Sequence, residues 1–539
     1  MRIILAFLGL WAMPCLTLCS QDIWGFVSVP PTGQTDSLTL PSTHRFQVLA
    51  VSLQELPDGS LLAPVPDYSG YTPINGSSNN GYFSINHEIS TPDGAITVFD
   101  AHFDAADRLW DLTNPSEIDF TSVQYLDRPC SGVITPWGNV IVGEEPTITT
   151  VDINGDGYHD SGWLVEFDPA TRQVVRKLYK AGKMRHENAA LAADNRTIYL
   201  ASEESDGFVY KFIGTEAGNL ENGDLFILKL DDEEAPNGVW VSVPNGTPAE
   251  CNSVQAFGAS VGATDFGALE DVDIDPQGRI YFACKGNGRV RRFTDNGSTV
   301  SDAGVFVLPG TYDIVTSSGT QAIEWGNGAD NLAFDNDGNL WVCHDSNGAF
   351  STDLNYVWVV GPSHTTDNPD LRVFLSSPVG SEPTGLTFSP DNRFIFMSFQ
   401  FASSTDNTYV AHDVAGTPII FKRGTTVCIA RKEKIGPEAE PVATADITYL
   451  HPAIVQLQIS PTPAKCHDVI SAKLSNEVFE LTYISITDLS GKVVWGQYVN
   501  YPTMTTELRL EVPALPSGEY IMSVLSCYQV QSGILVIQE

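Results

Sequence analysis

Apolar residues come along this chain in short runs rich in Val, Ile, Phe and Tyr, and glycine, asparagine, aspartate and proline separate the runs. A helical pattern, in which apolar residues recur every three to four positions, is scarce. Short apolar runs between turn-forming residues are typical of strands. The sequence therefore predicts an all-β protein.

Five of these runs follow a turn of the type Asp/Pro-x-Gly or Asp-Asn. The turn residues lie 57, 83, 60 and 54 residues apart, at Gly138, Asn195, Gly278, Gly338 and Asn392. A further strand at 82–88 supplies another unit without the turn. Repeats of this length fit four-stranded blades, so we expect a β-propeller of about six blades. A series of β-sandwiches is the alternative, but it does not explain polar residues at matched positions.

Polar residues recur at fixed distances from these turns. Eight residues before the turn residues stand Cys130, Glu187, Glu270, Asp330 and Thr384. Just past the strands stand Glu144-Glu145, Glu203-Glu204, Lys285, His344-Asp345 and Gln400. Equivalent positions in the blades of a propeller form rings around one channel. Buried like charges without a partner are costly, so such rings either bind cations or face water.

The composition narrows the class of protein. A chain of 539 residues is too long for one ordinary core, so one large closed architecture or several domains are expected. Its net charge of −37, from 66 acidic against 29 basic residues, argues against binding nucleic acid and suits divalent cations. An anionic substrate can approach only where bound metal reverses the local potential.

The first twenty residues predict a signal peptide, because Arg2 precedes the apolar run 3–18 and the small residue Ser20 ends it. No other apolar run approaches the roughly 18 residues of a membrane-spanning helix, so no transmembrane segment is expected. We therefore predict an exported protein, and a monomer.

The cysteine count points to an unpaired thiol. Of the nine cysteines, Cys15 and Cys19 lie in the signal segment, and an odd number of seven remains. We take Cys130 as the candidate for the unpaired thiol. Cys466 and Cys527 share the terminal domain and can pair, although sequence alone does not prove the bridge.

The segment Asp152-Ile153-Asn154-Gly155-Asp156-Gly157 has the spacing of a calcium-binding loop. Trp163 stands where an EF-hand needs its bidentate glutamate. Both a lone calcium site and a polar turn without an ion remain open.

The last part of the chain is predicted to be separate. Prolines and glutamates in residues 436–454 predict a linker, and alternating residues in 455–539 predict a small β-sandwich without a catalytic cluster. This module resembles the sorting domain of the type IX secretion system of Bacteroidetes, in the segments 461–464, 488–492 and 515–520. The resemblance implies the type IX machinery as a partner and a location at the cell surface or in the medium.

The body, residues 21–435, resembles the PhoX family of bacterial alkaline phosphatases. The resemblance rests on several motifs in order: Asn86-His87-Glu88, Cys130-Ser131-Gly132, Thr135-Pro136-Trp137-Gly138, Glu144-Glu145, 162–169, 185–189, Glu203-Glu204, Glu270-Asp271, Asp330-Asn331-Leu332 and 382–385.

That resemblance implies a six-bladed propeller with two irons and several calcium ions in a central site. It implies Cys130 as a thiolate bridging the irons, and carboxylate ligands among Glu88, Glu145, Glu187, Glu204, Glu270, Asp330 and Glu382. Arg185 and Lys285 are the candidates for holding a phosphate oxygen.

These observations favour a metal-dependent phosphatase acting on small phosphate monoesters. Two alternatives remain open: a calcium-stabilised surface propeller that binds without catalysis, and a calcium-dependent hydrolase of lactones or other esters. The chain has no Gly-x-Ser-x-Gly elbow, P-loop or dinucleotide-binding fingerprint, which disfavours serine acyl transfer and ATP or NAD chemistry.

Overall fold

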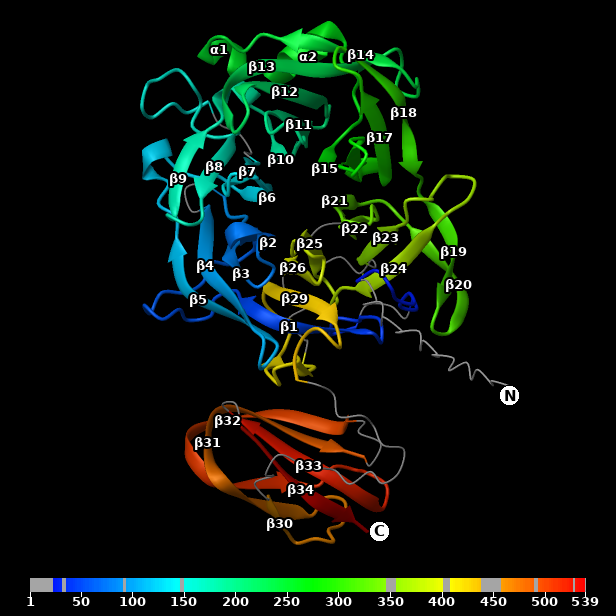
Figure 1. The fold of residues 1–539 in the computed structure, drawn as a ribbon. Coiled ribbons are helices and arrows are strands. Elements are labelled where there is room, and N and C mark those ends of the chain that lie inside the picture. The colour runs from blue at the N-terminus through cyan, green and yellow to red at the C-terminus, as the bar shows by residue number, and fades with distance from the viewer. Residues whose placement is uncertain are drawn as a thin grey trace, which may run out of the picture. The chain divides into compact units, whose positions relative to one another are not determined.

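The computed structural model describes residues 23–31, 35–90, 94–145, 150–345, 355–400, 408–437, 457–488, 493–526 and 529–538. The chain divides into two compact units, residues 1–439 and 440–539 (Figure 1). The predicted signal peptide at 1–20 and the predicted linker from residue 438 onward lie outside the described residues. Within the described part of the chain, no helix has the length and apolar character needed to cross a bilayer.

Strands dominate both units, so the prediction of an all-β protein is confirmed. The described α-helices are two short ones, α1 (Pro248–Cys251) and α2 (Val254–Val261). The strands of the first unit are β1 (His44–Val51), β2 (Pro66–Pro73), β3 (Asn80–His87), β4 (Ala95–Asp104), β5 (Leu109–Glu117), β6 (Pro129–Ile134), β7 (Val140–Glu144), β8 (Leu164–Asp168), β9 (Gln173–Lys177), β10 (His186–Leu191), β11 (Thr197–Ser202), β12 (Val209–Glu216), β13 (Asn219–Leu230), β14 (Gly238–Val243), β15 (Leu269–Ile274), β16 (Ile280–Cys284), β17 (Arg289–Asp295), β18 (Thr299–Val307), β19 (Gly310–Thr316), β20 (Gly319–Trp325), β21 (Ala329–Phe334), β22 (Leu340–His344), β23 (Tyr356–Val360), β24 (Leu371–Ser376), β25 (Glu382–Phe388), β26 (Phe394–Gln400), β27 (Ala411–His412), β28 (Pro418–Ile419) and β29 (Thr425–Arg431).

The large sheets of the first unit are antiparallel. Four-stranded sheets have the orders β2-β3-β4-β5, β6-β7-β8-β9, β21-β22-β23-β24 and β1-β29-β26-β25. A nine-stranded sheet has the order β10-β11-β12-β13-β14-β18-β17-β16-β15. Its strands β14 and β18 are joined only by the pairs Gly238↔Val300 and Val239↔Thr299. Figure 1 shows the sheets following one another around a common centre, with β2, β6, β10, β15, β21 and β25 nearest to it. The arrangement is propeller-like.

The two ends of the first unit meet in one sheet. Strand β1 pairs with β29 from His44↔Arg431 to Val51↔Thr425. This pairing leaves the sheets in a ring, because the earliest described strand completes the sheet formed by the last ones. This closure holds the first and last sheets of the ring together, and the radial arrangement leaves only short strand edges.

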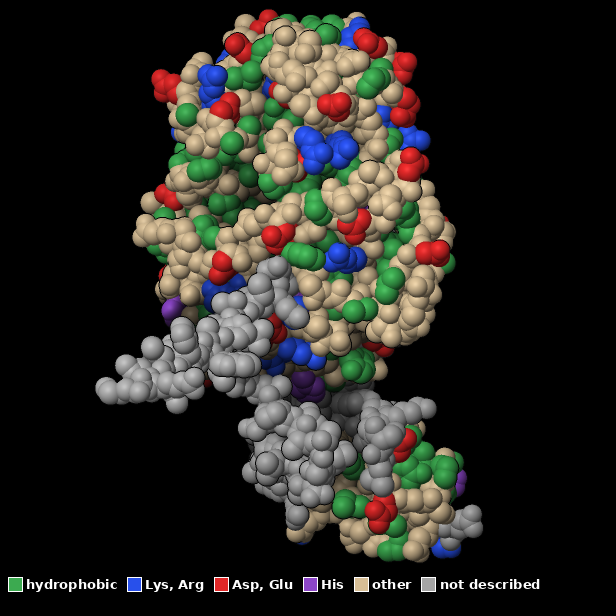
Figure 2. Space-filling view, turned by 45° about the vertical axis from the view of Figure 1, so that its right-hand side comes forward, with side chains coloured by type: hydrophobic (Ala, Val, Ile, Leu, Met, Phe, Trp, Pro, Cys, Tyr) green, Lys and Arg blue, Asp and Glu red, His purple; other side chains and the backbone are tan. Residues whose placement is uncertain are grey.

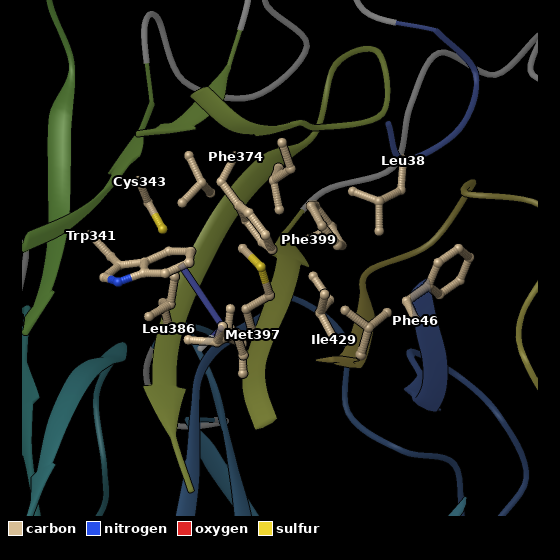
Figure 3. Packing of buried hydrophobic residues seen from close by; sticks show 14 of the residues in the cluster. Leu38, Phe46, Trp341, Cys343, Phe374, Leu386, Met397, Phe399 and Ile429 are labelled. Atoms are coloured by element: carbon tan, nitrogen blue, oxygen red, sulfur yellow. The ribbon is translucent and has the colours of Figure 1, made fainter. Parts of the chain in front are cut away.

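Apolar side chains fill the spaces between neighbouring sheets. In Figure 3, Phe46 of β1, Met397 of β26 and Ile429 of β29 lie in one cluster with Trp341 and Phe374 of the neighbouring sheet. The rings of Trp341 and Phe374 are 4.9 Å apart between centroids, in an edge-to-face arrangement. Such packing fixes the angle between sheets, and with it the positions of the inner strands.

Each inner strand carries an irregularity in its pairing with the second strand of its sheet. The register shifts between Pro66 and Ser69, Pro129 and Gly132, His186 and Ala189, Leu269 and Val272, Ala329 and Leu332, and Thr384 and Thr387. A bulge leaves the residues inside it outside the regular ladder and re-aims their side chains. The residues inside these bulges are the ones that line the centre of the unit.

The second unit contains β30 (Gln458–Ser460), β31 (Val469–Thr487), β32 (Val493–Glu511), β33 (Gly518–Ser526) and β34 (Gln529–Ile537). Hydrogen bonds join these five strands into one sheet, in which β31 pairs with β30, β32 and β33. The sequence predicts a small β-sandwich for this module, and the strand pairing is compatible with it. The long strand β31 is shared: its pairing with β32 shifts register after Lys473, its first part also pairs with β30, and its last part also pairs with β33. An apolar cluster that includes Ile470, Ile484 and Met522 forms the core.

Candidate metal centre

A cavity of about 250 Å³ lies among the inner strands of the first unit. Its wall contains nine carboxylates, three basic side chains, one thiol and one amide. The lining residues are Asp67, Glu88, Arg128, Cys130, Glu145, Arg185, Glu187, Glu203, Glu270, Lys285, Asp330, Asp345, Glu382 and Gln400.

Two positions in the sheets supply most of these side chains. The inner-strand bulges supply Asp67, Cys130, Glu187, Glu270 and Asp330. The ends of the second strands, or the residues just after them, supply Glu88, Glu145, Glu203, Lys285, Asp345 and Gln400. The two sets of matched positions in the sequence thus come together around one cavity.

The sheet that contains β25 departs from this rule. Its bulge holds Gly385, where the backbone φ is +62° and an added Cβ would lie 2.3 Å from the carbonyl oxygen of Asp67. A side chain at this position is therefore excluded. Thr384, the ring position expected in this sheet, does not line the cavity, and its hydroxyl donates to the Asp67 carboxylate. The sheet instead contributes Glu382, the first residue of β25.

At the end of β11, the neighbour of a predicted ligand faces the cavity. Glu203 lines the cavity and Glu204 does not. Successive residues of an extended chain point to opposite sides, so only one of two adjacent glutamates can face the centre. The same choice occurs at Glu144-Glu145. There Glu145 faces the cavity, while the Glu144 carboxylate is completely buried elsewhere, 2.9 Å from the ammonium of Lys177.

The other predicted residues come together. Ligand atoms lie within 4.8 Å of one another in four groups of three: Asp67, Cys130 and Glu187; Glu88, Cys130 and Glu145; Glu187, Glu270 and Asp330; and Asp330, Asp345 and Glu382. Cys130, Glu187 and Asp330 each belong to two groups. The groups therefore form one continuous series of potential cation sites, and the thiol is shared by two of them.

The basic side chains of the cavity are all directed at carboxylates. Lys285 Nζ lies 2.9 Å from Glu270, 3.0 Å from Asp330 and 3.1 Å from Asp345. A guanidinium nitrogen of Arg128 lies 2.7 Å from Glu145 and also contacts Glu88.

Arg185 is the third basic residue of the cavity. Its guanidinium lies 2.8 Å from Glu203 and also contacts Glu145. With Arg128 on its other side, Glu145 lies between two guanidinium groups. Arg185 and Lys285, the two predicted phosphate-binding residues, thus lie at the cavity wall beside candidate ligands.

Burial and mutual repulsion raise the pKa of several of these groups. Burial is the largest cause for Glu187, Glu270 and Glu382, whose pKa values lie well above the ordinary value, and neighbouring carboxylates raise them further. Burial, and then the nearby Glu187 and Glu88, likewise raise the pKa of the Cys130 thiol. These groups take up their charged forms only where a cation compensates them. A soft thiolate among hard carboxylates fits a site for more than one kind of metal.

Five residues of the cavity were not among the predicted site residues: Asp67, Arg128, Glu203, Asp345 and Gln400. Three of them, Glu203, Asp345 and Gln400, stand at or just past the ends of second strands. The sequence pattern placed them there without showing which way their side chains point. Asp67 stands eight residues before Asn75 of the turn at Ile74–Gly76, so the spacing of the repeat could have found it, although the sequence prediction treated this unit as lacking the turn. Arg128 has the positive φ of 45° directly before a proline, a backbone conformation that is rarely adopted and that sequence does not reveal.

The predicted calcium loop is closed by its own backbone. The two carboxylate oxygens of Asp152 accept hydrogen bonds from the backbone N–H groups of Gly155, Asp156 and Gly157, at 2.7 to 3.1 Å. These hydrogen bonds form in a polar turn with or without a bound ion, so both alternatives stay open.

The cysteine count did not identify Cys130, because all six described cysteines are free: Cys130, Cys251, Cys284, Cys343, Cys428 and Cys466. The proposed bridge therefore finds no support at Cys466, whose thiol donates to the Leu515 carbonyl at 3.3 Å, and Cys527 lies outside the described residues. Cys130 is distinguished by its place in the cavity.

Comparisons with known proteins identify a family for each of the two units. The family described as alkaline phosphatase PhoX matches residues 112–403, and the secretion system C-terminal sorting domain matches residues 458–538. The sorting domain indicates export by the type IX system to the cell surface or the medium. No curated protein sequence matches the chain.

One of the solved structures that match the chain shows the same fold. PhoX from Pseudomonas fluorescens in complex with vanadate, a transition state analogue, is similar at 19% identity and a TM-score of 0.59, over 77% of this chain and 99% of that one. Regucalcin from Agrobacterium tumefaciens matches at 12% identity and a TM-score of 0.35, over 72% and 97% of the two chains. Virginiamycin B lyase from Staphylococcus aureus matches at 10% identity and a TM-score of 0.32, over 72% of this chain and 99% of that one. Because the family match covers more than half of its length, the chain belongs to the PhoX family of alkaline phosphatases.

Proposed function

We propose that this protein is an exported, metal-dependent phosphatase that hydrolyses phosphate monoesters in the central cavity, as a monomer. One observation carries the proposal. This chain of the PhoX family has four groups of potential ligand atoms among its described residues. The groups overlap, because Cys130, Glu187 and Asp330 each belong to two of them. Multi-metal sites of this kind suit phosphoryl transfer, since cations can stabilise both the attacking and the leaving oxygen.

The catalytic unit is proposed to be a six-bladed propeller spanning residues 21–435, followed by a linker at 436–454 and the sorting domain at 455–539. The four four-stranded sheets support this number of blades. So does the weak β14–β18 junction, because it divides the nine-stranded sheet into the set β10–β14, which has one additional strand, and the four-stranded set β15–β18.

Donor chemistry suggests how the metals are divided. The two groups that contain Cys130 also contain Asp67 and Glu187, or Glu88 and Glu145, and the thiolate favours iron. The two groups without a thiol consist of carboxylates alone and favour calcium, which prefers oxygen ligands. We propose that Cys130 holds two irons together and that Glu270, Asp330 and Glu382 serve calcium. Glu203 is proposed as a metal ligand in place of Glu204, which was predicted from the sequence but does not line the cavity.

Arg185 is proposed to bind the phosphoryl group of the substrate, with Arg128 opposite it. Both guanidinium groups pair with Glu145. The exposed fraction of the side chain is 25% for Arg128 and 30% for Arg185. Guanidinium groups suit phosphate because their parallel N–H donors match two phosphate oxygens. Bound metals would supply the positive charge that polarises the phosphoryl oxygens. Lys285 is a less direct candidate, because its ammonium already contacts three carboxylates.

The test is hydrolysis of p-nitrophenyl phosphate by the purified full chain, with its metals measured by mass spectrometry on the same sample. Turnover that depends on both iron and calcium is expected. Arg185→Met should raise KM and lower kcat/KM by at least about tenfold, because a charged hydrogen bond to the phosphate is lost. Arg196→Met, an exposed arginine outside the cavity, serves as the matched control.

The metal content separates the alternatives. Absence of turnover in a chain fully loaded with iron and calcium would overturn the phosphatase assignment. Calcium without iron, together with unchanged stability of Cys130→Ala, would favour a non-catalytic surface propeller. Hydrolysis of lactones with calcium alone would favour the esterase alternative.

A further inference from the structure

A second cavity, of about 260 Å³, lies among the same inner strands and shares no lining residue with the metal centre. Its polar residues directly follow the candidate metal ligands in sequence. Ser131 follows Cys130, Asn188 follows Glu187, and Asp271 follows Glu270. The two cavities therefore lie on opposite sides of the inner-strand bulges, and the function proposed above leaves the second one without a role.

The second cavity contains two carboxyl groups and no basic partner among its described lining residues. It is lined by the side chains of Asp271 and Asp273 and by no lysine, arginine or histidine. Burial raises the pKa of Asp271 to about 8 and that of Asp273 to about 6, so Asp273 is the group that carries the negative charge at neutral pH.

Backbone N–H groups of the neighbouring sheet donate to both carboxyl groups: Leu332 to Asp271 at 2.9 Å, and Phe334 to Asp273 at 2.8 Å. These neutral donors hold the carboxyl groups in place but do not cancel the charge of Asp273. Asp271 Oδ1 already accepts hydrogen bonds from Asn188 Nδ2 and Val272 N. Each oxygen of Asp273 accepts one backbone N–H, from Ile274 or Phe334, and can accept a further hydrogen bond.

One polar atom beside these carboxylates lacks a partner. The Asn188 side chain is 8% exposed, and its amide nitrogen donates to Asp271 at 2.5 Å. Its Oδ1 has no hydrogen-bond partner among the described residues. A buried amide oxygen without a donor is costly, and it calls for a ligand that carries N–H or O–H groups.

The rest of the wall is apolar. Ile134, Phe334 and Phe388 are half-buried, and the Tyr68 side chain lies deeper. Aromatic and aliphatic walls provide no ligands for a bare metal ion, but they suit the carbon part of an organic cation, and aromatic faces attract an ammonium group.

We infer that this cavity binds a small organic ammonium ion. The ammonium group would donate to Asn188 Oδ1 and lie beside Asp271 and Asp273, while its alkyl part would contact Phe334 and Phe388. Carboxylates and an unpartnered amide oxygen supply the charge and the acceptors, and the apolar wall selects an organic cation over calcium or sodium.

The experiment is isothermal titration of the metal-loaded full chain with n-butylammonium chloride, and with 1-butanol as a neutral probe of similar size. We expect one saturable site for butylammonium and at least about tenfold weaker binding of butanol. Asp273→Asn should weaken butylammonium binding about tenfold, because the amide oxygen still accepts from Phe334 N–H while the charge is lost. Asp313→Asn, on the exposed hairpin strand β19, should bind as the parent does.

Three results would overturn the inference: no saturable binding of butylammonium, equal affinity for butanol, or one-for-one displacement of butylammonium by added calcium. The last result would show an inorganic cation site. The comparison of the two probes uses the unaltered protein, so it holds even if Asp273→Asn fails to fold. Far-UV circular dichroism and metal content of each variant establish whether the fold and the neighbouring metal centre are intact.

Discussion

The ammonium of Lys285 lies 3.0 Å from the carboxylate of Asp330, and two further carboxylates, of Glu270 and Asp345, lie within 3.1 Å of the same nitrogen. Asp330 and Asp345 also belong with Glu382 to one group of potential metal ligands. A metal ion bound by that group would therefore compete with the lysine for the same oxygens. Lys285 directly follows the second strand of its sheet, β16, and its ammonium provides a positive charge inside the cavity.

Replacing Lys285 by methionine should allow a further divalent cation to bind. Without the ammonium, its three carboxylates are left without their cation, and calcium favours such oxygen groups. The expected result is about one additional calcium per chain, measured by mass spectrometry after gel filtration in calcium buffer. Lys432→Met, at an exposed lysine, should leave the calcium content unchanged. An unchanged or lower content in Lys285→Met would contradict the competition.

Replacing Cys130 by serine should remove iron selectively. The hydroxyl is nearly the size of the thiol but is not a soft ligand, so affinity for iron should fall by at least about tenfold while calcium is retained. Iron content and the visible absorption of an iron–thiolate bond provide two independent measurements. Cys428→Ser changes a completely buried cysteine in an apolar cluster away from the cavity, and it should keep its iron even if stability falls. Equal loss of iron in both variants would contradict the assignment of Cys130 as an iron ligand.

The adjacent glutamates at the end of β11 offer a matched pair. Glu203→Gln removes a carboxylate from the cavity wall, whereas Glu204→Gln changes a side chain that does not line it. Metal affinity or kcat/KM should fall by about tenfold in the first variant and stay within about twofold in the second. If Glu204→Gln has the larger effect, the orientation of this strand end is wrong.

Removal of the metals should make stability depend on pH. Burial, partly opposed by Lys285, raises the pKa of Asp330 from 3.8 to about 6. Because the folded pKa lies above the unfolded one, the stabilising contribution is present below about pH 4 and is lost as the pH rises through about 6. The loss amounts to about 3 kcal/mol for this group.

Urea unfolding of the chelated protein between pH 4 and 7 measures this dependence. The metal-loaded protein should not show this loss of stability, since bound cations keep the Asp330 carboxylate ionised in the folded state. Asp330→Asn in chelator should show a shallower decline than the parent chain. A chelated parent whose free energy of unfolding rises steadily over this range would contradict the prediction.

The repeat was predictable because a four-stranded sheet has a fixed order of strand, turn and strand. A turn residue such as Gly278 lies a constant number of residues after the bulge that holds Glu270, since the inner strand must span the same depth in each sheet. The sequence by itself therefore determined the all-β class, the repeat, and Cys130, Glu187, Glu270 and Asp330 as residues of one ring.

Tertiary structure decided the rest. Which of Glu203 and Glu204 faces the centre depends on how the strand end twists, and the alternation of an extended chain makes both choices equal in sequence. Asp67 has the spacing of the repeat, eight residues before Asn75, but its place in the ring depends on β2 lying between its neighbours in space. Lys285 reaches Asp330 only across the boundary between two sheets. Closure likewise pairs β1 with β29, almost 400 residues later, through side-chain packing and backbone hydrogen bonds that no local pattern contains.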